Sequence, residues 1–303
     1  PNPEEPAALA MAVEKAKETD AELVMASDPD ADRVGAAVKN NEGEWVLLNG
    51  NQTALMFVYY LITRWKELGK INGKEYIVKT IVTTETIKTI AERNGVEMYD
   101  VYTGFKWIAN VMRENEGKKN YIGGGEESYG FLCEDFVRDK DAVSACVILA
   151  EIAAWAKDQG LSLYQLLQKI YVEYGFSKEK GISVVKKGKS GAEEIEAMMK
   201  KFRENPLTEI AGSKVTYFYD YSTLKGKDYA ENETVTLDMP TTSNVLQYFT
   251  EDNTKVSIRP SGTEPKIKFY CEVHSKVKSI DELPEAEKAA EEKINQIKAS
   301  LGI

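Results

Sequence analysis

Three aspartates at alternating positions, Asp28, Asp30 and Asp32, are the residues whose spacing is best suited to chemistry, and Arg33 follows them directly. Carboxylates this close repel one another unless a cation neutralises them, and Mg²⁺ is a hard cation that takes oxygen ligands in a small site. Spacings of two exclude one face of a helix, which needs spacings of three and four. We therefore predict a Mg²⁺ site on a tight loop, where Arg33 can hold a phosphate with its forked donors.

Two other interpretations of the aspartate loop compete with a magnesium site. A calcium loop between two helices needs Gly at its sixth position and Glu at its twelfth, but counting from Asp28 these are Arg33 and Lys39. This mismatch excludes the calcium loop. A solvated acidic turn stays open, because aspartate is common in turns. The apolar runs at residues 23–25 and 34–38 predict short strands on either side of the loop.

A second polar segment, residues 123–130, contains three successive glycines followed by Glu126, Glu127 and Ser128. Glycine lets the backbone approach a ligand closely, and the glutamates and the serine offer acceptors for sugar hydroxyls. The segment therefore predicts a polyol-binding loop, with a simple tight turn as the alternative. We expect it and residues 103–106 at the carboxyl ends of strands, where α/β sheets bind ligands.

A third segment, residues 259–266, reads Arg-Pro-Ser-Gly-Thr-Glu-Pro-Lys. The forked donors of Arg259, the hydroxyls of Ser261 and Thr263 and the open backbone at Gly262 together predict a phosphate cradle. The spacing of a Walker loop is absent, which argues against a nucleotide-dependent sugar kinase. Two prolines favour a rigid, preorganised loop, and a polar hairpin tip is the alternative.

Charge and composition limit the partners of the chain. Its 303 residues carry a net charge of −10, which argues against general nucleic-acid binding, so an anionic substrate must be held by local Arg and Lys side chains. Three cysteines without metal-binding spacing indicate a reducing compartment, the cytoplasm. We recognise neither a membrane-spanning apolar run nor a signal peptide, and expect no membrane partner.

Strands alternate with helices along the chain, which predicts the α/β fold class. We expect a three-layer α/β domain with a mixed sheet over residues 41–174. The tail of a similar domain, residues 1–40, precedes it, and a smaller α+β domain, residues 175–303, follows. Apolar periodicity predicts helices at residues 6–18, 50–68, 83–94, 105–113, 141–157, 163–174, 192–203 and 285–301. It predicts further strands at residues 45–48, 76–82, 96–102, 121–122, 182–185, 214–221, 235–237, 245–249, 255–258 and 266–273. Residues 175–191 are interpreted as a linker leading into the strand at 182–185.

Five segments in one order resemble the α-D-phosphohexomutase family, in its phosphoglucomutase/phosphomannomutase branch. They resemble, in chain order, the family's metal loop, two sugar-recognition segments, an Arg-Glu-Lys-Asp segment and a phosphate loop; the residues are 28–33, 103–107, 125–130, 138–141 and 259–265. For residues 138–141, a solvated helix start is the alternative, since acidic residues favour a helix N-terminus.

The resemblance implies an enzyme of carbohydrate metabolism, an intramolecular phosphotransferase of the isomerase class. It interconverts hexose 1-phosphate and hexose 6-phosphate through a phosphoserine and a hexose 1,6-bisphosphate, with Mg²⁺ as cofactor, mainly by positioning and charge neutralisation. Glucose 1-phosphate is the expected substrate. The general acid/base is expected to be Lys140, whose pKa burial beside other cations would lower. The resemblance implies these further roles: Asp28, Asp30 and Asp32 bind Mg²⁺, Arg33 steadies the phosphoryl group, Lys106 lies near the reacting hydroxyl, Glu126 and Ser128 bind sugar hydroxyls, and Arg259, Ser261, Gly262 and Thr263 hold the other phosphate.

The family's phosphoserine lies in a Thr-Ala-Ser-His-Asn-Pro type segment, and this sequence has no match to it. Its one histidine, His274, is followed by Ser-Lys-Val. The resemblance starts at the end of the family's second domain, so we expect a chain that lacks the N-terminal domains and the phosphoserine and is inactive alone. The alternative is a non-catalytic protein that binds phosphosugars or Mg²⁺.

Overall fold

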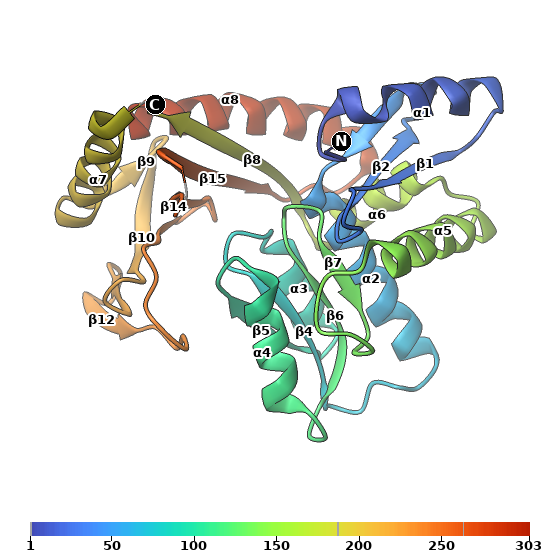
Figure 1. The fold of residues 1–303 in the computed structure, drawn as a ribbon, viewed down its shortest axis with the longest axis horizontal. Coiled ribbons are helices and arrows are strands. Elements are labelled where there is room, and N and C mark those ends of the chain that lie inside the picture. Colours follow the sequence, from blue (N-terminus) through green and yellow to red (C-terminus); the bar gives the residue numbers. More distant parts are fainter. Residues whose placement is uncertain (1, 187, 263) are drawn as a thin grey trace. The chain divides into compact units, whose positions relative to one another are not determined.

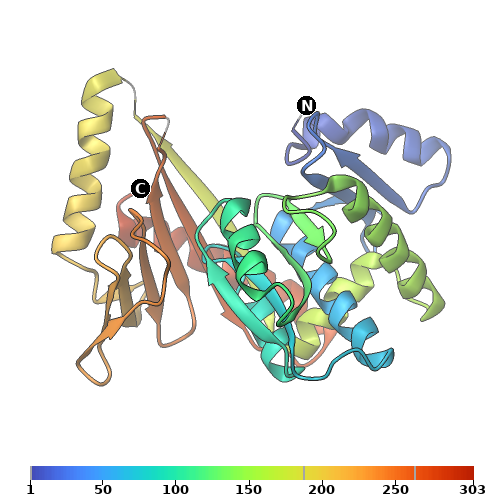
Figure 2. The same cartoon turned by 60° about the horizontal axis from the view of Figure 1, so that its bottom comes forward.

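A computed structural model describes residues 2–186, 188–262 and 264–303 of the chain. The chain divides into two compact units, Pro1–Gly175 and Phe176–Ile303. Figure 1 shows the helices and strands of both units, most of them labelled, and Figure 2 shows them from a second direction.

The first unit begins with a helix on a small sheet. Helix α1 (Pro6–Glu18) buries Leu9 and Ala16 against the three-stranded antiparallel sheet β1-β2-β3. The strands are β1 (Leu23–Ser27), β2 (Val34–Lys39) and β3 (Trp45–Leu48). The predicted helix at residues 6–18 and the two strands flanking the aspartate loop are therefore confirmed.

The rest of the first unit is a four-stranded sheet covered by helices, with the strand order β5-β4-β6-β7 (Figure 1). Strands β5, β4 and β6 are parallel and β7 is antiparallel, so the predicted mixed sheet is confirmed. Helix α2 packs on one face, where Phe57 stacks on Phe131 at 4.6 Å between ring centroids, and α4 packs on the other face against Tyr76 and Val78. The elements are α2 (Gly50–Glu67), β4 (Glu75–Thr80), α3 (Thr86–Arg93), β5 (Glu97–Val101), α4 (Phe105–Asn115), β6 (Asn120–Gly125), β7 (Phe131–Cys133), α5 (Ala142–Asp158) and α6 (Leu163–Tyr174).

The second unit is an antiparallel sheet with two long helices, which confirms the predicted α+β domain. Its main strand order is β12-β11-β10-β13-β14-β15-β8, and β9 pairs with β10. Helices α7 and α8 contact β15, whose Ile267, Phe269 and Cys271 are buried (Figure 2). The elements are β8 (Phe176–Val185), α7 (Gly188–Glu204), β9 (Glu209–Ile210), β10 (Ser213–Asp220), β11 (Lys225–Asp228), β12 (Glu233–Thr236), β13 (Leu246–Thr250), β14 (Lys255–Pro260), β15 (Lys266–Ser275), a 3-10 turn (Ile280–Glu282) and α8 (Leu283–Leu301).

The three glycines predicted to lie in a loop are instead the end of strand β6, and that part of the prediction is wrong. A Cβ on Gly124 would lie 2.4 Å from the carbonyl oxygen of Val78, and one on Gly125 would lie 2.5 Å from the ring of Phe131. The glycines are therefore required by close packing within the sheet, and the loop begins at Glu126.

The predicted linker is also wrong, because β8 is one continuous strand that pairs with β15 along its whole length. Strand β8 forms an edge of the sheet, where polar and lysine side chains are tolerated and discourage pairing with other chains. Its Lys178 and Lys180 therefore reflect an edge position rather than an irregular connection. The short strands β7, β9 and β11 were not predicted.

Two further properties bear on the environment of the protein. The thiols of Cys133 and Cys271 are buried and that of Cys146 is half-buried, and all three are free. Within the described ranges, none of the helices combines the length and the apolar character needed to cross a lipid bilayer.

Candidate functional site

The aspartate loop joins β1 to β2, and it brings its three carboxylates together. One oxygen from each of Asp28, Asp30 and Asp32 lies within 4.8 Å of the others. Ala31 has a left-handed φ of 57°, and its N–H donates to the carbonyl of Asp28 at 3.1 Å, so the chain turns tightly between the carboxylates. Oxygen ligands of octahedral Mg²⁺ lie about 3–4 Å apart, so a small contraction fits the trio to that ion.

Asp28 is the buried member of the trio and is held by Arg33. Its Oδ1 accepts the N–H groups of Asp32 and Arg33 at 3.0 Å each, and its Oδ2 accepts Arg33 Nε at 2.6 Å. Burial by itself raises the pKa of Asp28, but these bonds outweigh burial and hold the pKa well below its ordinary value. Arg33 Nη1 also contacts Asn2 and Glu4, so this arginine clamps the loop.

Lys140 reaches the aspartate loop from a distant part of the sequence. Its Nζ lies 2.7 Å from Asp32 Oδ2, and its methylenes pack on Gly130, where a Cβ would lie 2.2 Å from Lys140 Cδ. Burial lowers the pKa of Lys140, but Asp32 and Glu126 raise it above the ordinary value. The expected lowering of the pKa is therefore wrong, because Lys140 lies among carboxylates instead of cations.

Glu126 contacts the segment at residues 103–106, which precedes and opens α4. Its Oε1 accepts the N–H of Gly104 at 2.7 Å, and Gly104 has a φ of 117°, a conformation that favours glycine. Glu126 is 5% exposed, and burial raises its pKa, opposed by the nearby charge of Lys140. The two segments expected at the carboxyl ends of strands therefore meet directly.

Backbone hydrogen bonds tie the same loops together. The N–H of Val34 donates to the carbonyl of Tyr129 at 3.0 Å, and the N–H of Ala142 donates to the carbonyl of Ala31 at 2.9 Å. The aspartate loop, residues 103–106 and residues 126–142 thus form one site within the first unit, although Asp32 and Lys140, which contact each other in it, are more than 100 residues apart in the sequence.

The other predicted site residues of the first unit, Ser128 and Lys106, are less buried than Asp28 and Glu126. Ser128 is half-buried, and Lys106 is exposed with its Nζ 5.1 Å from the centre of the Trp107 ring. The helix-start interpretation of residues 138–141 holds as well, because Asp141 caps α5 by accepting the N–H groups of Val143 and Ser144. This segment therefore both starts a helix and supplies Lys140.

The predicted phosphate loop connects β14 to β15 in the second unit and opens onto a cavity of about 210 Å³. The N–H of Ser261 donates to the carbonyl of Lys266 at 2.7 Å and closes the loop, while Gly262 is exposed. Thr263 lies outside the described residues. The cavity is lined by Arg259, Pro260, Ser261, Glu264, Lys266 and Lys268.

Lys266 and Lys268 add two cations that the sequence interpretation missed. Lys268 is the direct strand partner of Arg259, so both side chains stand on the same face of the hairpin. The alternation of residues 266–273 was recognised, and its polar positions on either side of Ile267 were the available signal. The loop is therefore more positive than Arg259 alone indicates.

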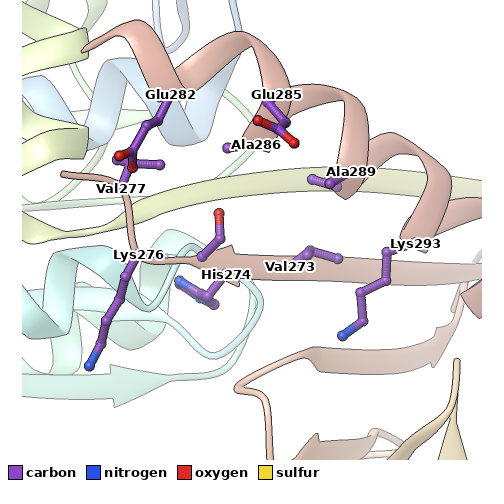
Figure 3. Close-up of a pocket in the computed structure, with 11 residues that line it drawn as sticks. Val273, His274, Lys276, Val277, Glu282, Glu285, Ala286, Ala289 and Lys293 are labelled. Carbon is purple, nitrogen blue, oxygen red and sulfur yellow. The ribbon is translucent and has the colours of Figure 1, made fainter. Parts of the chain in front are cut away.

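A second cavity of about 390 Å³ lies at the opposite end of β15, about 30 Å along the strand from the phosphate loop. Figure 3 shows Glu282 of the 3-10 turn and Glu285 of α8 on one side of it and His274 on the other. Burial lowers the pKa of His274, but the carboxylate of Glu272 at 2.7 Å raises it above its ordinary value. The histidine thus belongs to a buried ion-pair network, in which Glu272 also contacts Lys255 at 2.9 Å.

Comparison with known proteins finds the same family along the chain. The domain II model of phosphoglucomutase/phosphomannomutase matches residues 1–43, the domain III model residues 49–174, and the C-terminal domain model residues 183–290. Phosphoglucomutases of Staphylococcus haemolyticus and Staphylococcus aureus are 34% and 38% identical over 273 and 269 residues. These matches cover 90% and 89% of this chain but 49% and 48% of the relatives. The chain thus spans about half the length of the curated relatives it matches.

A solved structure agrees at the level of the fold. The phosphoglucomutase/phosphomannomutase family protein of Burkholderia thailandensis has a TM-score of 0.62 at 19% identity. The match covers 99% of this chain and 51% of that one. Three successive domain models of one family match in order from the aspartate loop to α8. The chain therefore belongs to the phosphoglucomutase/phosphomannomutase family.

Proposed function

We propose that this chain forms the metal-binding and hexose-phosphate-binding part of a phosphoglucomutase/phosphomannomutase. Such an enzyme interconverts hexose 1-phosphate and hexose 6-phosphate through a phosphoserine and a hexose 1,6-bisphosphate. The observation that carries the proposal is that three loops from different parts of the sequence meet in the first unit. Lys140 Nζ lies 2.7 Å from Asp32 Oδ2, and the N–H of Gly104 donates to Glu126 Oε1 at 2.7 Å. In this proposal the end of the family's domain 2 corresponds to residues 1–40, its domain 3 to residues 41–174 and its domain 4 to residues 175–303.

The aspartate trio is proposed to hold Mg²⁺, which when bound neutralises charge on a transferring phosphoryl group. Arg33 keeps Asp28 ionised and oriented, and its guanidinium is proposed to steady that phosphoryl group. Were Asp32 to hold Mg²⁺, Lys140 would lose its carboxylate partner, and its ammonium is proposed to serve the reacting oxygen as the general acid. Lys106, on the exposed start of α4, is proposed to assist there.

Glucose 1-phosphate is the proposed substrate, supported by the names of the Staphylococcus relatives. Glu126 and Ser128 bind its hydroxyls. Charge-assisted hydrogen bonds to the phosphate come from the loop of the second unit. The proposed phosphate ligands are Arg259, Ser261, Gly262, Thr263, Lys266 and Lys268.

The proposed phosphoserine carrier and the N-terminal domains belong to the same polypeptide, in the cytoplasm, which the three free thiols favour. The present sequence has no serine–histidine–asparagine segment. This chain alone is therefore proposed to bind hexose phosphate without turning it over. Turnover in a coupled assay free of contaminating mutase would contradict that part of the proposal.

Replacement of Arg259 by Ala tests the phosphate loop. We expect glucose 1-phosphate to bind more weakly by about 1.5–3 kcal/mol, the loss typical of a charge-assisted hydrogen bond. Isothermal titration calorimetry measures the difference. The matched control is Arg113→Ala, which removes an exposed arginine from α4 in the other unit and is expected to leave the affinity unchanged. Equal affinities of Arg259→Ala and wild type would remove this loop from the site.

Two substitutions with opposite expected signs test the cation site. Asp32→Asn removes a ligand and is expected to weaken Mg²⁺ binding about tenfold. Lys140→Met removes the ammonium group that competes for Asp32 and is expected to strengthen Mg²⁺ binding about tenfold. Calorimetric titration with MgCl₂ measures both, and Asp20→Asn, an exposed aspartate, is the control. Weaker binding in Lys140→Met would show that Lys140 does not compete with the cation.

A further inference from the structure

We propose that Thr83 is a positioning residue for hexose recognition, because it fixes the direction of the paired glutamates Glu126 and Glu127. The sequence interpretation expected Thr83 at the start of a helix, but α3 begins at Thr86. Residues 80–84, here called the threonine loop, instead form a buried turn between β4 and α3. The inference rests on the proposed function and adds to it a residue outside the ligand-binding set.

Thr83 contacts Glu127 through both its donor and its acceptor capacity. Its Oγ1 accepts the backbone N–H of Glu127 at 3.1 Å, and it lies 3.5 Å from Glu127 Oε2 and 2.8 Å from Thr80 Oγ1. Thr80 donates its own hydroxyl to Glu127 Oε2 at 3.2 Å. Both threonines are 0% exposed, so these bonds form without competition from water.

Fixing Glu127 on the threonine loop also fixes its neighbour. Glu126 and Glu127 share one peptide unit at the turn that follows β6, so the backbone cannot rotate at one without moving the other. Glu127 faces Thr80 and Thr83, while Glu126 accepts the N–H of Gly104 and interacts with the charge of Lys140. A rotation that released Glu127 would therefore turn Glu126 away from the proposed sugar site.

The buried ammonium group of Lys79 anchors the backbone of the threonine loop. Lys79, 1% exposed, places its Nζ 2.7 Å from Asp100 and 2.9 Å from Glu85, and donates to the carbonyl of Thr83 at 3.4 Å. The amide of Thr84 donates to Asn51 at the start of α2. Neighbouring side chains thus lock the residue that orients the glutamates, the arrangement that precise sites require.

Helix α2 limits the movement of Glu127 from another direction. A Cβ on Gly50 would lie 2.0 Å from the carbonyl oxygen of Glu127, so the backbones of α2 and of residues 127–129 are in direct contact. Glu127 is therefore held by backbone packing against Gly50 and by side-chain bonds to the threonine loop. Of these, the bonds to Thr83 can be removed without changing side-chain volume.

Thr83→Val removes the hydroxyl, and Thr83→Ser retains it. In Thr83→Val we expect affinity for glucose 1-phosphate to fall about five- to tenfold, as for one lost hydrogen bond at an orienting group, with affinity for inorganic phosphate unchanged. Thr83→Ser is expected to stay within about twofold of wild type. Calorimetry measures both affinities, and amide hydrogen exchange of Glu127 is expected to accelerate in Thr83→Val only. The matched control is Thr53→Val, a buried threonine of α2 whose hydroxyl bonds the carbonyl of Asn49.

The outcomes separate this inference from the function on which it rests. Wild-type affinity for glucose 1-phosphate in Thr83→Val overturns the positioning role and leaves the proposed function standing. Equal weakening for glucose 1-phosphate and inorganic phosphate also overturns it, since a general structural defect would act on both. A wild-type chain that binds neither ligand contradicts the proposed function and this inference together. If Thr83→Val does not fold, Glu127→Gln replaces it, because this change weakens the bonds from the hydroxyls of Thr80 and Thr83 to the side chain of residue 127. The expected result is the same: weaker binding of glucose 1-phosphate and unchanged binding of inorganic phosphate.

Discussion

Replacement of Lys255 by Met is expected to destabilise the second unit by about 3–5 kcal/mol. The Lys255 and Glu272 side chains are 2% and 4% exposed, and their charged atoms lie 2.9 Å apart on neighbouring strands. Methionine keeps much of the lysine volume but removes the ammonium group beside the buried carboxylate of Glu272, which keeps its contact with His274. Leaving a buried charge with fewer partners costs more than the intact ion pair contributes, so the single substitution has a large effect.

The chain offers an internal control for this experiment. Its four tryptophans, at positions 45, 65, 107 and 155, all belong to the first unit. In urea unfolding, far-UV circular dichroism is expected to show an earlier transition in Lys255→Met, while tryptophan emission stays unchanged. Lys200→Met removes an exposed pair on α7 and should shift stability by no more than about 0.5 kcal/mol. Replacing both Lys255 and Glu272 by apolar residues should recover most of the loss, and failure to do so would contradict this account.

Replacement of Asp28 by Asn is expected to cost the first unit about 2–4 kcal/mol at pH 7 in the absence of divalent cations. The carboxylate accepts two backbone N–H groups and the Nε of Arg33 and is 3% exposed. An amide can accept only at its oxygen, so its NH₂ group would face a donor of Arg33 or the backbone. The loop would lose its anchor although the side-chain volume is unchanged.

The same substitution predicts a pH dependence of known sign. The pKa of Asp28 is lower in the folded than in the unfolded chain, because the bonds from Arg33 and Asp32 outweigh burial. The ionised carboxylate therefore stabilises the fold fully above its unfolded pKa of about 4, and this contribution is lost as pH falls toward the folded pKa. Thermal unfolding followed by tryptophan emission with EDTA should show a gap between wild type and Asp28→Asn that is full at pH 7 and smaller at pH 3. A gap independent of pH would show that the charge of Asp28 does not stabilise the loop.

The sequence predicted the elements whose periodicity matches their burial. The spacing of Leu9 and Ala16 predicted α1 at its observed bounds, and the aspartate spacing predicted a loop between two strands. Local sequence patterns gave wrong predictions at positions whose structure depends on contacts with residues distant in the sequence. Position 124 pairs with Val78 of β4 and requires glycine because a Cβ would meet the carbonyl oxygen of Val78, and no local pattern contains that contact.

The same limit applies to the candidate site. Residue types and spacing selected the aspartates, Glu126 and Lys140, but not the partners that determine their charge states. The raised pKa of Lys140 depends on Asp32, which lies far away in the sequence. The helix predicted at residues 83–94 included Thr83, whereas its hydroxyl contacts Glu127 in the turn after the neighbouring strand β6, and α3 begins at Thr86.

The contacts around the aspartate loop cross the boundary that homology places between two domains. The loop falls within residues 1–43, matched by domain II, yet Tyr129, Lys140 and Ala142, which close it, fall within residues 49–174, matched by domain III. A chimaera that exchanges one of these segments between relatives would therefore separate the loop from the residues that shape it. A chimaera that keeps this loop intact should therefore take residues 1–43 and residues 49–174 from the same relative.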